Sequence, residues 1–68
     1  LLNPFDIRAL KVVRAFPGIT FIGLDAFNIP TAAMRDLADR GLVRKLFIGW
    51  EITALGRIAL IEQRKGKA

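Results

Sequence analysis

Apolar residues recur at intervals of three and four positions over residues 4–16, which predicts an amphipathic helix. Asn3 before Pro4 is typical of a helix start, because asparagine caps free amides and proline at the first helical position loses no hydrogen bond. Pro17-Gly18 then ends the helix. Helical spacing groups an apolar face of Phe5, Ala9, Val12, Val13 and Phe16. The other side of this helix carries Arg8, Lys11 and Arg14.

Two further helices are expected in the middle of the chain. Residues 21–27 predict a short helix capped by Thr20, and Asn28 suits a left-handed turn residue after it. A longer helix should begin at Pro30-Thr31 and stop before Gly41, since glycine commonly follows a helix end. Its expected buried stripe is Ala33, Met34, Leu37 and Ala38. Asp36 and Arg40, four residues apart, should pair on its exposed side.

A hairpin and a last helix complete the pattern. Residues 42–47 predict a strand, Ile48-Gly49 a tight turn, and residues 50–53 the return strand. Thr53 should cap the last helix, which has Leu55, Ile58, Ala59 and Glu62 on its turns. We therefore expect one domain over residues 1–63 and a basic, disordered tail over residues 64–68.

The same periodicities predict which apolar side chains form the core. The expected core comprises Phe5, Leu10, Val13, Phe16, Leu24, Phe27, Met34, Leu37, Leu42, Ile52, Leu55 and Ile58. Phe47 and Trp50 are expected to pack beneath the hairpin. The alternative for these two aromatic residues is a partner-binding or dimer patch, because so small a domain cannot bury every large apolar side chain.

Composition narrows the possible chemistry. The chain has 68 residues, 53% of them apolar, which is enough for a single small core. It contains no Cys, His, Ser or Tyr. Disulfides, thiolate metal sites and Ser-His-Asp or Cys-His nucleophile systems are therefore excluded. We expect no catalytic residues, no metal and no cofactor, and thus not an enzyme.

The charge balance points weakly to an anionic partner. The net charge is +5, and three of the eleven basic residues lie in the last five positions, so residues 1–63 carry only +2. The apolar stretches are far shorter than the ~20 residues of a membrane-spanning helix, and no export signal is apparent. A cytoplasmic location without membrane association is the resulting expectation.

Three segments carry a resemblance to a known family. Residues 24–31, LDAFNIPT, resemble the turn into the recognition helix of bacterial winged-helix proteins. Residues 34–44, MRDLADRGLVR, are similar to the end of that helix and the start of the wing. Residues 51–57, EITALGR, resemble the corner after the wing. Together they resemble winged helix-turn-helix regulators, broadly of the MarR type, from bacteria, archaea and phages.

The resemblance implies a mainly α fold with a small β-hairpin: a three-helix core, a two-stranded wing and a C-terminal helix. It also implies a transcriptional regulator that binds double-stranded DNA, as a homodimer, with the helix starting near Thr31 in the major groove. Thr31, Ala32 and Arg35 would face the bases, since arginine can grip guanine through two acceptors. The implied phosphate contacts are Asn28, Arg44 and Lys45.

The apolar hairpin tip supports an alternative function. Residues 46–50 read LFIGW, whereas a DNA-binding wing usually carries basic residues or glycine near phosphates. The alternative is a winged-helix module that binds another protein through Phe47 and Trp50, without DNA. An apolar, solvent-exposed hairpin tip would favour this alternative, and a positive surface around Arg35 would favour DNA.

Overall fold

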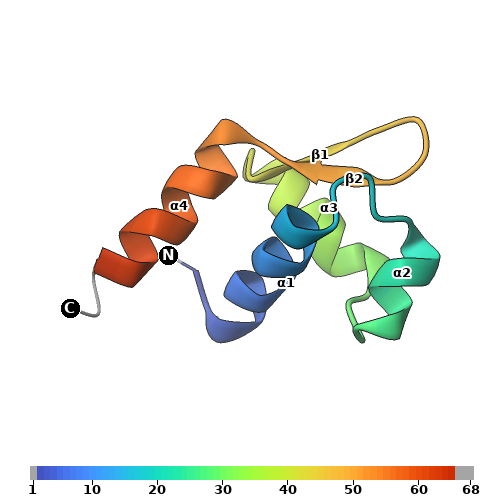
Figure 1. The fold of residues 1–68 in the computed structure, drawn as a ribbon, viewed down its shortest axis with the longest axis horizontal. Helices are drawn as coiled ribbons and strands as arrows, with labels where there is room; N and C mark the ends of the chain where they lie inside the picture. The colour runs from blue at the N-terminus through green and yellow to red at the C-terminus, as the bar shows by residue number, and fades with distance from the viewer. Residues whose placement is uncertain (1, 66–68) are drawn as a thin grey trace.

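The computed structural model describes residues 2–65 and consists of four helices and one small antiparallel sheet over that range. Figure 1 shows α1 at the centre, with α4 at one end of the molecule and α2 at the other, and the hairpin running across them. Helix α1 packs against α3, α4 and β2. The elements are α1 (Pro4–Ala15), α2 (Phe21–Ala26), α3 (Thr31–Asp39), β1 (Val43–Lys45), β2 (Trp50–Ile52) and α4 (Ala54–Lys65).

Local capping explains why the helices begin where the sequence predicts. The Asn3 side chain accepts the Asp6 N–H at 2.8 Å, and the Asp6 carboxylate accepts the Asn3 N–H at 3.3 Å. This reciprocal pair satisfies two amides that have no partner inside the helix. Thr20 caps α2, and Thr53 accepts the Gly56 N–H at 3.0 Å to cap α4. The predicted caps are therefore confirmed.

The residues that follow α2 and α3 have a left-handed backbone conformation, which ends each helix. Asn28, after α2, has φ 59°, and Gly41, after α3, has φ 78°. Asparagine and glycine tolerate this conformation better than other residues. The Leu42 N–H then donates to the Leu37 carbonyl at 2.9 Å, which turns the chain from α3 into β1.

The core lies between α1, α3 and the hairpin. Its largest fully buried side chains are Leu10, Val13, Leu24, Met34, Leu37 and Leu60. Leu42 and Ile52 are buried as predicted, and Phe27 is half-buried. Trp50, 4% exposed, packs beneath the hairpin as expected.

Four residues of the predicted core are not buried, because α1 and α4 are rotated about their own axes relative to the orientation that the apolar pattern predicts. Phe5 and Phe16 of the first helix, and Leu55 and Ile58 of the last, are 37–53% exposed. In α1 the buried side consists of Asp6, Ala9, Leu10 and Val13. Asp6 lies on this side because its carboxylate accepts a hydrogen bond from Arg40, the residue that follows α3. In α4, Gly56 faces inward against the Leu42 carbonyl, where no larger residue fits. Both helix phases are therefore set by tertiary contacts.

The hairpin is shorter than predicted. Val43 pairs with Ile52 and Lys45 with Trp50, so the first strand ends at Lys45 and not at Phe47. Residues 46–49 form a four-residue connection, closed by the Leu46 N–H donating to the Gly49 carbonyl at 2.9 Å. Gly49 has φ 98°, which this connection requires. The expected two-residue turn is thus replaced by a longer loop that carries Phe47 and Ile48 outward.

The segment between α1 and α2 is hydrogen-bonded to the hairpin. Ile19 forms an isolated antiparallel bridge with Trp50. The Gly18 N–H donates to the Trp50 carbonyl at 2.9 Å, and the Trp50 N–H donates to the Ile19 carbonyl at 3.0 Å. This bridge attaches the start of α2 directly to β2.

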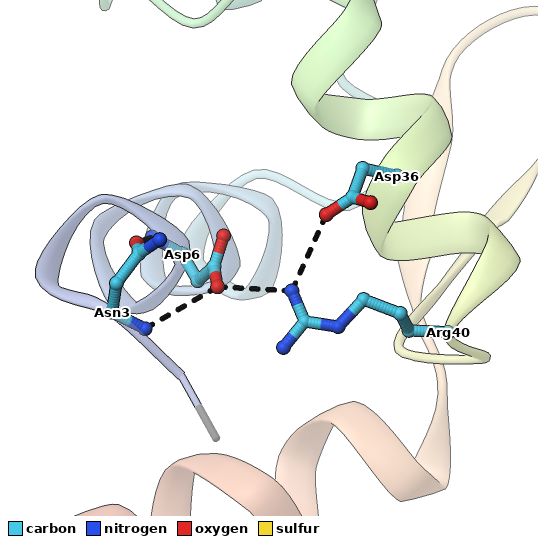
Figure 2. Close-up of polar contacts among 4 residues, drawn as sticks. All are labelled: Asn3, Asp6, Asp36 and Arg40. Atoms are coloured by element: carbon cyan, nitrogen blue, oxygen red, sulfur yellow. Dashed lines mark hydrogen bonds and ion pairs between the residues drawn. The ribbon is translucent and has the colours of Figure 1, made fainter.

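An ion-pair cluster joins the start of α1 to the end of α3 (Figure 2). Arg40 lies 2.9 Å from the buried Asp6 and 3.3 Å from Asp36, so the predicted pair of Asp36 with Arg40 is confirmed. The hydrogen bond to Asp6 raises the pKa of the Arg40 guanidinium above its ordinary value. The ion pair of Arg40 with Asp6 is not predicted by the apolar spacing, which selects only apolar residues for the core.

Asp6→Ala is expected to destabilise the domain by about 1–3 kcal/mol, because it removes both a capping partner and a largely buried ion-pair acceptor. Asp36→Ala is the matched control, since the Asp36 side chain is 65% exposed. Exposed pairs of this spacing contribute only about 0.3–0.5 kcal/mol. Urea unfolding followed by circular dichroism measures both variants, and equal losses would contradict the structural role given to Asp6.

The last helix continues beyond its predicted end. It runs to Lys65, two residues into the expected tail, and residues 66–68 lie outside the described residues. None of the helices within residues 2–65 has the length and apolar character needed to cross a membrane.

Candidate nucleic-acid interface

Helix α3 presents the side chains that the sequence assigns to base reading. Thr31, Ala32 and Arg35 are exposed, whereas Met34 and Leu37 on the other side are buried. Pro30 precedes the helix and no side chain caps its first amides. The outward side of α3 is therefore exposed, and its first turn has no side-chain cap.

A shallow hollow of about 430 Å³ lies between α3 and the hairpin. Its lining residues are Thr31, Arg35, Ala38, Asp39, Lys45 and Trp50. Three of the six predicted contact residues, Thr31, Arg35 and Lys45, thus meet on one surface although they come from two elements.

The charges around this hollow are two cations against one carboxylate. Within residues 2–65, Arg35 forms no ion pair and no side-chain hydrogen bond. The Lys45 ammonium lies 5.5 Å from the centre of the Trp50 ring and donates to the Leu46 carbonyl at 3.0 Å. Asp39 contributes the negative charge, while Asp36 is held at Arg40. The local balance is weakly positive.

The other three predicted contact residues are exposed but lie away from the hollow. Arg44 forms an ion pair with Glu51 across the hairpin, and neighbouring strand residues point to opposite faces, so Arg44 faces away from Lys45. Asn28 lies in the turn between α2 and α3, and Ala32 lies on α3 outside the hollow. Of the six predicted contact residues, Thr31, Arg35 and Lys45 therefore line the hollow, and Asn28, Ala32 and Arg44 do not.

A second and larger hollow of about 560 Å³ adjoins the first. We call it the apolar groove. Phe21 and Ile22 from α2 line it opposite Phe47 and Ile48 from the hairpin loop. Its other lining residues are Thr20, Thr31, Lys45, Gly49 and Trp50. Figure 1 shows the loop reaching toward the end of the molecule where α2 lies.

The side chains of the apolar groove are unusually exposed for their size. Phe47 is 98% exposed, and Phe21, Ile22 and Ile48 are 68–69% exposed. The expectation that Phe47 packs beneath the hairpin is therefore wrong, because the strand ends two residues before it. Phe21 and Ile22 are candidate binding residues that the sequence pattern did not predict. Ile22 lies two residues before the buried Leu24 and therefore points outward on a helix, whereas Phe21 lies three residues before Leu24, so the spacing does not predict its exposure.

No protein-family model, curated protein or solved structure matches this chain. Within residues 2–65 there is also no cluster of three or more His, Cys, Asp or Glu side chains that could hold a metal ion. The two neighbouring hollows and the side chains that line them are therefore the features that indicate a function.

Proposed function

We propose that this chain is a winged helix-turn-helix domain that binds duplex DNA with α3 in the major groove. The order of three helices, hairpin and helix supports this proposal, as does the bridge between Ile19 and Trp50 that adds a third short strand position to the hairpin. In such a domain α3 is the reading helix and the hairpin is the wing.

The single observation that carries the proposal is the meeting of Arg35, Thr31 and Lys45 on one exposed surface. An arginine that reads guanine must be accessible and must not already be neutralised, because its guanidinium has to reach two acceptors on the base. Arg35 meets that requirement within the described residues. Lys45 on the hairpin lines the same hollow as Arg35 and would contact a neighbouring phosphate.

The remaining predicted contacts have supporting roles in this proposal. The uncapped first amides of α3 and the Asn28 side chain would face phosphate, as helix starts commonly do. Arg44 would contribute less than a free cation, because Glu51 already neutralises its charge. Ala32 offers a small apolar contact on the same side of α3.

Arg35→Ala is expected to weaken binding to a preferred duplex, first selected from a random pool, by about 1–3 kcal/mol while changing binding to random duplexes little. Lys45→Ala should weaken binding to all duplexes alike and reduce the slope of log affinity against log salt by about 0.9, because one phosphate contact is lost. Fluorescence anisotropy across a salt series measures both.

Arg57→Ala is the matched control for the DNA experiment. Arg57 is an exposed arginine on α4, at the opposite end of the molecule from α2. Its replacement changes the net charge as Arg35→Ala does and should leave specific binding unchanged. Equal losses for the two arginines on every duplex would show that α3 is not a reading helix, and no binding at low salt would refute the function itself.

One observation favours the alternative, a domain that binds protein. The apolar groove exposes Phe47 almost completely beside Phe21, and a duplex offers a polyanionic surface that would not cover these side chains. The hairpin tip thus meets the condition that favours docking, while the weakly positive hollow beside it meets the condition that favours DNA.

A further inference from the structure

We infer that the apolar groove is an interface between two copies of this chain, in which the hairpin loop of each copy occupies the groove of the other. The inference goes beyond the proposed DNA binding and rests on different residues. It assigns the groove one occupant, a second copy of the same surface.

The first reason is the shape of the surface. Phe47, 98% exposed, projects at the edge of a hollow whose other side is formed by Phe21 and Ile22. The projection and the hollow belong to one face of one chain, which is what a two-fold contact requires, because each copy must present both halves. A two-fold axis beside the loop would place each Phe47 against the Phe21 and Ile22 of the partner.

The second reason is the apolar area available. A phenylalanine side chain buries roughly 150–250 Å², so covering Phe47 and Phe21 in both copies removes roughly 700 Å² from water at their present exposure. Ile22 and Ile48, each about two-thirds exposed, add to this area. The total reaches about 1,000 Å², the threshold for a biological interface and below the standard size, and predicts a weak, reversible dimer.

The third reason is charge. Lys45 is the one charged side chain among the residues that line the groove, and its ammonium is held over the Trp50 ring at the side toward α3. Two copies therefore meet with little repulsion across a surface that is otherwise apolar or uncharged. A partner rich in phosphate or carboxylate would find one cation and four large apolar side chains, which is a poor match.

The contact would also cover part of the proposed DNA surface. Thr31 lines both the apolar groove and the hollow that holds Arg35. A partner seated in the groove would block the start of α3, so self-association and duplex binding should compete. This consequence depends on the proposed function, whereas the dimer itself does not.

Sedimentation velocity without DNA tests the inference. The chain should associate reversibly with increasing concentration, and Phe47→Ser should raise the dissociation constant at least tenfold. Because Phe47 is almost wholly exposed, its replacement should leave the fold unchanged, together with the melting temperature measured below the dissociation constant, where both chains are monomeric. Ile58→Ser is the matched control, since Ile58 is a half-exposed apolar residue on α4, outside the groove, and its replacement should leave association unchanged.

Site-directed cross-linking gives a second readout, because the chain contains no cysteine. A mixture of Phe47→Cys and Phe21→Cys chains should form a mixed disulfide dimer on mild oxidation, while Ile58→Cys mixed with Phe21→Cys should not. A chain that stays monomeric at high micromolar concentration, or that dissociates with Ile58→Ser and not with Phe47→Ser, would overturn the inference. So would Phe47-dependent binding of a monomer to phosphatidylserine vesicles, which would make the occupant a membrane surface.

Discussion

Gly49→Ala is expected to unfold the domain or to remove most of its stability. A Cβ atom at residue 49 would overlap the Gly18 carbonyl oxygen and lie 2.8 Å from the Ile19 oxygen, so backbone atoms would have to move. The residue also has φ 98°, which side chains disfavour by about 1–3 kcal/mol. A chain of this length has roughly 3–10 kcal/mol in total. Thermal and urea unfolding should therefore show a loss comparable with the whole stability.

Gly18→Ala separates the two causes. Gly18 has φ 81°, but no atom lies within 4 Å of the position its Cβ would take. Its replacement should therefore carry the backbone strain alone, about 1 kcal/mol or slightly more. If the two variants lose the same amount, the close approach of the hairpin loop to the segment before α2 is not present in solution.

Leu37→Ala is expected to cost about 2–5 kcal/mol, because it empties space in the middle of the core. Leu37 is 1% exposed and lies on the inward side of α3, opposite Arg35. Leu55→Ala removes the same atoms from α4 at a side chain that is 53% exposed, and should cost clearly less. Urea midpoints measure the difference, and a loss below about 0.5 kcal/mol for Leu37→Ala would show that α3 is rotated from its observed phase.

The starts of α1, α2 and α4 and the end of α3 could be predicted here because they depend on neighbouring residues. Asn3, Thr20 and Thr53 cap helices through hydrogen bonds to amides three residues later, and Gly41 ends α3 through its own φ. These interactions are complete within a few positions of the chain, so a local pattern contains all the information they need.

Helix rotation could not be predicted in the same way. The inward side of α1 includes Asp6, an acidic residue whose burial depends on Arg40, which follows 34 residues later. The inward side of α4 includes Gly56, which apolar spacing does not count as a core residue although it permits close contact with Leu42. Apolar spacing considers only a short stretch of sequence and includes neither the Arg40 that contacts Asp6 nor the Leu42 that contacts Gly56. It therefore predicts core positions for Phe5, Phe16, Leu55 and Ile58.

The residues of the candidate site also differ in whether a local pattern can predict them. Thr31 and Arg35 share one helix, so their common exposure follows from spacing alone. Lys45 joins them only because the hairpin folds back beside α3, and Arg44 faces away because it is one strand residue earlier. To predict the apolar groove, one must know that β1 ends at Lys45 and that Phe21 points outward. Neither can be derived from the apolar pattern.

The bridge between Ile19 and Trp50 has a consequence for how fast and how tightly the groove can be occupied. Two backbone hydrogen bonds hold the start of α2 to β2, so the two sides of the groove belong to one hydrogen-bonded unit. Little conformational entropy remains to be lost when such a surface is covered. The proposed dimer should therefore form in a single kinetic phase without a preceding rearrangement, at rates typical of preformed surfaces, and changes in its affinity should appear mainly in the dissociation rate.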